Sequence, residues 1–91
     1  MAEDDLTIEL TRDQALVLSE WLSRVIGTAV FDGLVERDRA VWSPLYMIAG
    51  TLETSLVEVF APDYATRVEA ARERLLEMLS SGAHFENKPE K

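Results

Sequence analysis

The sequence predicts an all-α protein: a three-helix antiparallel bundle with a short extended N-terminal arm and a disordered C-terminal tail. Apolar residues recur at intervals of three and four over most of the chain, and helix-capping and helix-breaking residues divide this pattern into three segments. The chain has 91 residues, 47% of them apolar and 29% charged, which is typical of one compact domain. We therefore expect an N-terminal arm over residues 1–10, a helical bundle over 11–82 and a flexible tail over 83–91.

The arm is predicted from an alternation of apolar and polar residues. Leu6, Ile8 and Leu10 alternate with Thr7 and Glu9, and this period of two suits extended backbone. No second strand-like run follows with which the segment could pair. We interpret it as an arm that lies on the helical core; the alternative is a strand edge offered to another chain.

The first helix is predicted to begin after Thr11, because Thr11 and Gln14 fit a capping box. Its apolar stripe consists of Leu18, Trp21, Leu22, Val25 and Ala29. Gly27 weakens a helix, and Asp32-Gly33 is a turn dipeptide. We therefore expect this helix to end between residues 25 and 30, and a loop to continue to about residue 36.

The second helix is predicted to be the central one, because apolar residues cover more than half of its circumference. The main stripe is Val41, Leu45, Ile48, Leu52, Leu56 and Val59, and Trp42, Tyr46 and Ala49 add a second apolar face. If Ser43 is the N-cap, Pro44 occupies the first helical position, where its missing N–H has no cost; if the helix begins near Asp38, Pro44 must kink it. We favour a short helical turn over residues 37–42 and a main helix over 43–60.

The third helix is predicted to begin at Pro62, with Asp63 in its first turn, where the helix dipole favours a negative charge. The link to the second helix is so short that an antiparallel hairpin is expected. The stripe of the third helix is Tyr64, Val68, Ala71, Leu75 and Met78, and Gly82 is suited to end the helix. Leu52 and Val68 are expected to meet between the second and third helices.

The residue types exclude most enzyme mechanisms, and we predict a non-enzymatic protein without metal or cofactor. The chain has no Cys, and its only His, His84, lies in the predicted tail. Glu53 and Glu58 lie about 140° apart on a helix and so do not form a catalytic pair. Thr54-Ser55-Leu56 resembles the phosphopantetheine attachment motif of acyl carrier proteins, but Ser55 lies inside the helical pattern, so this cofactor is not expected.

The charge balance predicts neither a nucleic-acid binder nor a membrane protein. Seventeen acidic against nine basic residues give a net charge of −8, which repels phosphate backbones and anionic lipids. The N-terminus is acidic and lacks the apolar run of a secretory signal, and no apolar stretch reaches the roughly 20 residues that span a bilayer. Basic residues before the predicted tail are all Arg, which is typical of GC-rich bacterial genes. We therefore expect a bacterial cytoplasmic protein.

The spacing of several segments adds a resemblance to a known group. These segments are Asp13-Gln14-Ala15-Leu16-Val17-Leu18, Trp21-Leu22, Trp42, Leu52-Glu53, Leu56-Val57-Glu58-Val59-Phe60, Pro62-Asp63-Tyr64 and Ala70-Ala71-Arg72. Over roughly residues 10–75 the chain resembles small acidic helical proteins of bacteria, largely uncharacterised, some of which are immunity partners of polymorphic toxins. The chain departs from their pattern between residues 25 and 38 and at Pro44. The resemblance implies a helical fold and an immunity function.

The distribution of charge suggests where a partner would bind. No basic residue lies between Arg39 and Arg67, and we expect this flank of the bundle to attract a basic protein. The predicted partner-binding residues are Glu53, Glu58, Asp63, Trp42 and Tyr46. We predict an immunity or antitoxin protein that neutralises a basic toxin domain. The alternative is a helical adaptor or regulator that acts through homodimerisation, so both a monomer and a homodimer remain open.

Overall fold

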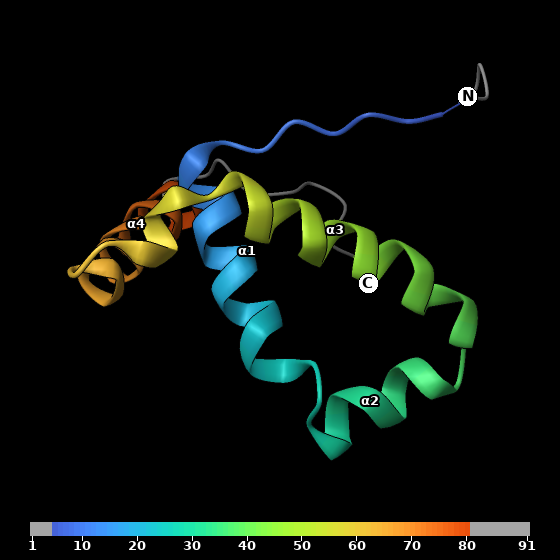
Figure 1. The fold of residues 1–91 in the computed structure, drawn as a ribbon. Helices are drawn as coiled ribbons and strands as arrows, with labels where there is room; N and C mark the ends of the chain where they lie inside the picture. Colours follow the sequence, from blue (N-terminus) through green and yellow to red (C-terminus); the bar gives the residue numbers. More distant parts are fainter. Residues whose placement is uncertain (1–4, 81–91) are drawn as a thin grey trace.

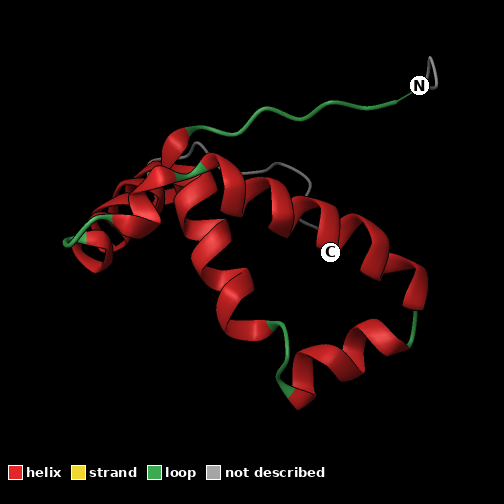
Figure 2. Ribbon diagram, in the orientation of Figure 1, coloured by secondary structure: helices red, strands yellow, loops and turns green. Residues whose placement is uncertain are grey.

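The computed structural model describes residues 5–80, apart from the side chains of Glu58 and Val59, and the regular secondary structure in this part of the chain is all helical (Figures 1 and 2). Its elements are α1 (Arg12–Val25), α2 (Ala29–Glu36), the 3₁₀ turn η1 (Arg39–Val41), α3 (Trp42–Ser55), the 3₁₀ turn η2 (Val57–Phe60) and α4 (Tyr64–Ser80). The all-α prediction is confirmed. The predicted three-helix bundle is matched only in part, because residues 5–80 form four α-helices. The predicted tail, 83–91, lies outside the described residues.

The start of α1 is fixed by the predicted capping box. The Thr11 hydroxyl accepts a hydrogen bond from the Gln14 backbone N–H at 3.1 Å, and the Gln14 side chain accepts one from the Thr11 N–H at 2.9 Å. These two bonds satisfy two backbone donors that a helix end leaves without an intrahelical partner. The helix ends at Val25, inside the predicted window.

The segment predicted as a loop after α1 instead contains α2. Gly27, with a φ of +101°, reverses the chain between the two helices. The Thr28 hydroxyl caps α2 by accepting from the Phe31 N–H at 3.3 Å, and the Asp32 carboxylate accepts from the Gly27 N–H at 3.0 Å. Asp32-Gly33 therefore lies inside α2 and does not form a turn. The Asp32 side chain instead accepts a hydrogen bond from the turn that precedes the helix.

Replacing Gly27 by Ala is expected to lower the free energy of unfolding by about 1–2 kcal/mol, because the positive φ is unfavourable for a residue with a Cβ. A Cβ atom at Gly27 would contact nothing within 4 Å, so the cost is conformational and not steric. Gly50, inside α3, is the matched control: Gly50→Ala, also without a close contact, should stabilise the protein by about 0.5–1 kcal/mol. Equal effects of the two substitutions in urea unfolding would contradict this account of the turn.

The start of α3 differs from the prediction by one residue, which changes the role of Ser43. The helix begins at Trp42 directly after η1, so Ser43 lies inside it and is not its N-cap. Pro44 still falls in the first turn, where backbone N–H groups have no intrahelical acceptor. The missing N–H of Pro44 therefore breaks no hydrogen bond, as the prediction required.

The end of α3 comes at Ser55, and the predicted continuation to residue 60 is wrong. The Thr54 hydroxyl lies 3.1 Å from the Gly50 carbonyl and 3.2 Å from the Thr51 carbonyl, and so competes for the helical acceptors. Leu56 is extended, with φ −101° and ψ 105°, and its side chain is buried in the core. The chain continues through η2 and a turn before α4 begins.

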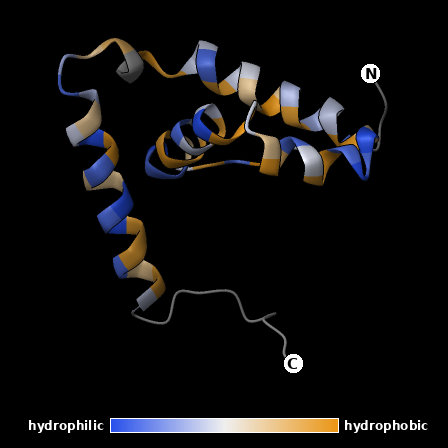
Figure 3. Cartoon of the chain, turned by 90° about the horizontal axis from the view of Figure 1, so that it is seen from below, coloured by the Kyte–Doolittle hydropathy of each residue, from blue (hydrophilic) through white to orange (hydrophobic). Residues whose placement is uncertain are grey.

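The central helix is α1, which packs against both α3 and α4. The core cluster is Leu16, Leu22, Leu52, Leu56, Val68 and Ala71. Leu52 and Val68 are therefore both in the core, but α1 lies between their helices and joins them. The predictions of a central second helix and of an antiparallel hairpin are wrong: α4 runs across α3, and its apolar side faces the rest of the molecule (Figure 3).

A paired charge also holds α4 against α1. The Arg74 guanidinium donates two hydrogen bonds to the Asp13 carboxylate, from Nε at 2.7 Å and from Nη2 at 2.8 Å. These bonds lower the pKa of Asp13 below its ordinary value of 3.8, because they stabilise the ionised carboxylate.

The Asp13 pKa predicts how this contact responds to acid. Because the folded-state pKa is below the unfolded value, the stabilisation is complete above pH 3.8 and is lost as the pH falls through the folded-state pKa. Asp13→Asn should therefore show a smaller loss of stability between pH 7 and pH 3 than the unsubstituted protein, measured by urea unfolding. Glu73→Gln, an exposed change on α4, is the control. An unchanged pH dependence in Asp13→Asn would show that this pair does not stabilise the fold.

Candidate functional site

Four aromatic side chains from three helices form a continuous row. Trp21 of α1 meets Phe31 of α2 edge to face, with ring centroids 5.7 Å apart. Phe31 meets Trp42 of α3 at 6.4 Å, also edge to face, and Trp42 stacks on Tyr46 at 5.1 Å. Trp21 is 43% exposed and Tyr46 59% exposed, so both ends of the row are open to contact.

Hydrogen bonds and ion pairs fix the middle of this row. The Trp42 indole N–H donates to the Glu36 carboxylate at 3.0 Å, and the same carboxylate group pairs with Arg39 at 3.3 Å. Glu36 is the last residue of α2, so these contacts tie α2 to the start of α3. The Trp42 ring is therefore held in one orientation, and a partner would lose little side-chain entropy in contacting it.

Two grooves adjoin the aromatic row, and carboxylates line both. The larger, of about 740 Å³, is lined by Ile26, Gly27, Asp32, Glu36, Arg39, Ala40, Trp42 and Tyr46. The smaller, of about 320 Å³, runs between α1 and α3 and is lined by Ser19, Leu22, Ser23, Ile26, Tyr46, Ala49 and Glu53. Ile26 and Tyr46 line both grooves, so the two form one surface. We call it the aromatic–acidic face, defined by Trp21, Phe31, Trp42, Tyr46, Asp32, Glu36 and Glu53.

The predicted partner-binding residues divide into two groups in the structure. Trp42, Tyr46 and Glu53 lie together on one side of α3, because residues four and seven positions apart share a helix face. Asp63 lies elsewhere, ahead of α4, where Arg67 pairs with its carboxylate at 2.9 Å. Arg67, which bounds the stretch without basic residues, therefore offsets the charge of Asp63. The Glu58 side chain lies outside the described part of the chain.

The sequence reasoning missed part of this face. Phe31, Asp32 and Glu36 belong to α2, which was predicted as a loop, and Trp21 was placed only in the stripe of the first helix. One local signal was available: Thr28 precedes Ala29 and Val30 in the manner of an N-cap. The pairing of Phe31 with Trp21 and Trp42 depends on how three helices pack, and no local pattern encodes it.

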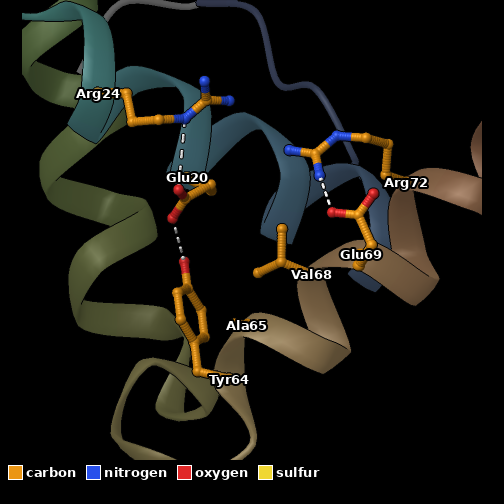
Figure 4. A pocket seen from close by; sticks show the side chains of 7 residues that line it. All are labelled: Glu20, Arg24, Tyr64, Ala65, Val68, Glu69 and Arg72. Carbon is orange, nitrogen blue, oxygen red and sulfur yellow. Dashed lines mark hydrogen bonds and ion pairs between the residues drawn. The ribbon is translucent and has the colours of Figure 1, made fainter.

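A second, polar pocket of about 490 Å³ lies between α1 and α4 (Figure 4). The Tyr64 hydroxyl donates to the Glu20 carboxylate at 3.2 Å, and Arg24 pairs with Glu20 at 3.4 Å. Across the pocket, Arg72 pairs with Glu69 at 2.6 Å. Burial, with the nearby Glu20 carboxylate, raises the pKa of Tyr64, so its hydroxyl keeps its proton and remains a donor.

The polar pocket has the properties of a structural contact. Its two carboxylates each have an arginine partner, and its lining contains no serine, histidine or cysteine to act as nucleophile or base. The Tyr64–Glu20 hydrogen bond instead links α4 to α1 beside the buried Val68. The aromatic–acidic face, with exposed rings and an acidic rim, is the better candidate for binding.

The described residues contain neither a cluster of metal ligands nor a membrane-spanning helix. Within residues 5–80, no three His, Asp or Glu side chains are grouped so that they could hold a metal ion. Over the same residues, no helix combines the length and the apolar character needed to cross a membrane.

No protein-family model, no curated protein and no solved structure matches this chain.

Proposed function

We propose that this chain is a non-enzymatic protein-binding domain, an immunity or antitoxin protein of a bacterial cytoplasm that neutralises a basic toxin domain through its aromatic–acidic face. The single observation that carries the proposal is the aromatic row, exposed at its two ends, with its rim of carboxylates. Such an arrangement offers flat rings and negative charges to the same partner. The resemblance to small acidic immunity proteins supports the same conclusion.

The chemistry of this face suits arginine and lysine side chains. A guanidinium stacks on the face of a tryptophan or tyrosine ring and pairs with a carboxylate, and both contacts strengthen when a partner excludes water. Glu53 is exposed and has no ion-pair partner within the described residues, so its charge is available to a partner. A toxin that cleaves or binds nucleic acid carries basic groups of this kind in its active site.

The proposal is tested by co-expression with a candidate partner. The partner is a basic C-terminal domain of a large secreted protein encoded beside this gene, produced from an inducible promoter in a bacterial host. This chain should restore growth, and the purified domains should form a one-to-one complex. Tyr46→Ala combined with Glu53→Lys should abolish the rescue, because the two changes remove the exposed ring and reverse the free charge of the face.

Matched controls separate loss of binding from loss of folding. Leu76→Ala with Glu73→Lys makes the same two kinds of change on α4, at an exposed apolar residue and an exposed carboxylate. This control variant should still restore growth. Rescue that survives the change at Tyr46 and Glu53 but fails with the α4 variant would show that a different face binds the toxin. Absence of any complex between the purified domains would refute the proposed function for that partner.

The alternative function, a helical adaptor or regulator that acts through self-association, rests on the same exposed rings. Trp21 and Tyr46 are of the residue types enriched at the centres of protein interfaces. If the aromatic–acidic face joined two copies, Tyr46→Ser would convert a dimer to a monomer in light scattering. If it binds a toxin, the same substitution would leave the oligomeric state unchanged.

A further inference from the structure

The side of α3 that lies away from Tyr46 is also exposed, and it is apolar. With about 100° of rotation per residue, Met47, Ile48 and Thr51 lie between about 100° and 160° around the helix axis from Tyr46. Met47 is 70% exposed, and Ile48 is also exposed. None of these side chains carries a charge. The helix therefore has two exposed flanks of different chemistry, one aromatic and acidic and the other aliphatic.

The N-terminal arm lies over this aliphatic flank without being buried. Residues 5–10 are free of regular secondary structure, and Figure 1 shows them leaving the start of α1 on the α3 side and diverging from α3 toward the N-terminus. Leu6 is 93% exposed and Ile8 80% exposed, and no backbone hydrogen bond of residues 5–10 occurs within the described part of the chain. An extended apolar segment with free backbone groups is a template for pairing with another strand.

A groove of about 340 Å³ separates the arm from the body of the protein. Its lining is Leu6, Ile8, Leu10, Leu18, Met47, Ile48, Thr51 and Leu52. No charged side chain is among them, and Thr51 is the only one with a polar side chain. A cavity of about 150 Å³ lined in this way accommodates a benzene molecule. The groove therefore has room for two or three apolar side chains that this chain does not itself supply.

We propose that a second copy of this chain occupies the groove, with the two N-terminal arms paired antiparallel about a two-fold axis. The uncharged lining allows this occupant. Each copy carries a net charge of −8, so two copies approach most easily through a surface without charged side chains, and this groove is such a surface. A basic partner would find no carboxylate in the lining. The arm of the second copy can supply the side chains that fill the groove, since it presents apolar residues at alternate positions.

The sequence of the arm selects one register for the pairing. With Ile8 opposite Ile8 of the second copy, Leu6 faces Leu10 and Thr7 faces Glu9, so three apolar pairs form and no two carboxylates face each other. Moving the centre to Glu9 would place Glu9 opposite itself. Moving it to Thr7 would place Asp5 opposite Glu9. Both alternatives lose an apolar pair and create a like-charge contact, so the register centred on Ile8 is preferred.

The first test measures association of the full chain by sedimentation equilibrium from micromolar to near-millimolar concentration. We expect a monomer–dimer equilibrium whose dissociation constant rises at least about tenfold in Ile8→Glu, because the dimer would bury a carboxylate without a partner. Val30→Glu adds the same charge at an exposed apolar residue of α2 and should leave the equilibrium unchanged. Folding is unaffected in both variants, since both side chains are exposed. A chain that remains monomeric throughout, or a dimer insensitive to Ile8→Glu, would overturn the proposal.

The second test uses the absence of cysteine from the chain. In the proposed register the two Ile8 residues are directly opposite, at a Cα separation of about 4.5–5.5 Å that a disulfide can bridge. Ile8→Cys should therefore give a disulfide-linked dimer under mild oxidation. Thr7→Cys, one position along the same arm, should form far less of it, because Thr7 faces Glu9. Equal cross-linking of the two variants would show that the arms collide at random and do not pair in this register.

The dimer proposed here and the toxin-binding function stand on different flanks of α3, and their tests separate. Ile8→Glu should abolish self-association and leave growth rescue intact, whereas the combined change at Tyr46 and Glu53 should do the reverse.

Discussion

Replacing Leu52 by Ala is expected to lower the free energy of unfolding by about 2–5 kcal/mol. Leu52 is 7% exposed and lies in the core cluster where α3 packs on α1. Truncating it removes apolar contacts and leaves a cavity that the surrounding backbone can fill only in part. A domain of this size has about 5–15 kcal/mol of stability in total, so the substitution removes a large share of it. Urea unfolding followed by circular dichroism measures the loss.

Leu76→Ala is the matched control for this prediction. It makes the same chemical change on α4, where the leucine is 55% exposed, and should cost less than about 1 kcal/mol. A loss below about 1 kcal/mol at Leu52, or equal losses at the two positions, would show that the cluster around α1 is not the stabilising core.

If the chain binds a basic toxin domain as proposed, reversing the charge of Glu53 to Lys is expected to slow their association by about tenfold at low salt, because this carboxylate would contribute to the field that attracts the toxin. The dependence of the association rate on salt should also become flatter, because fewer opposite charges remain to be screened. The fold should survive, since the Glu53 side chain is exposed and lies off the core side of α3. Stopped-flow kinetics at two ionic strengths measures both effects.

Glu73→Lys provides the control for the change in net charge. It is an exposed carboxylate on α4 and has no ion-pair partner within the described residues. Because both variants replace one Glu by Lys, they have the same net charge. If association depended only on net charge, the two variants would be slowed equally. An effect concentrated at Glu53 is expected if the aromatic–acidic face meets the partner, and slower association in the Glu73 variant alone would place the contact on α4.

The division of α3 into two exposed flanks explains why its sequence is apolar on more than one side. The sequence pattern alone predicted a buried central helix, but Val41 and Ile48 of its main stripe are exposed, as is Tyr46 of its second face. Only the side that bears Leu52 packs on α1. Apolar residues that a single chain leaves exposed on two flanks are consistent with two contact surfaces, which is how the proposed toxin contact and the proposed dimer use them.

The sequence by itself determined the features that depend on neighbouring residues. It determined the all-α class, because helical periodicity repeats within one or two turns, and the start of α1, because the Thr11–Gln14 cap spans three residues. It also determined that Leu52 and Val68 are buried, since each lies in the middle of an apolar stripe. It predicted Trp42, Tyr46 and Glu53 as binding residues, and the helix places them on one side because their spacing matches its turns.

Only the tertiary structure decided how the helices are arranged and which residues complete the aromatic–acidic face. The helix α2 was hidden because the Asp32 side chain bonds back to Gly27, five residues away, so that an apparent turn dipeptide lies within a helix. The place of α1 between α3 and α4 follows from the break after Ser55, which turns α4 across α3. The aromatic row then joins Trp21, Phe31 and Trp42 from three helices. These contacts link residues ten or more positions apart, and their geometry is set by packing between helices, which no periodicity within a helix specifies.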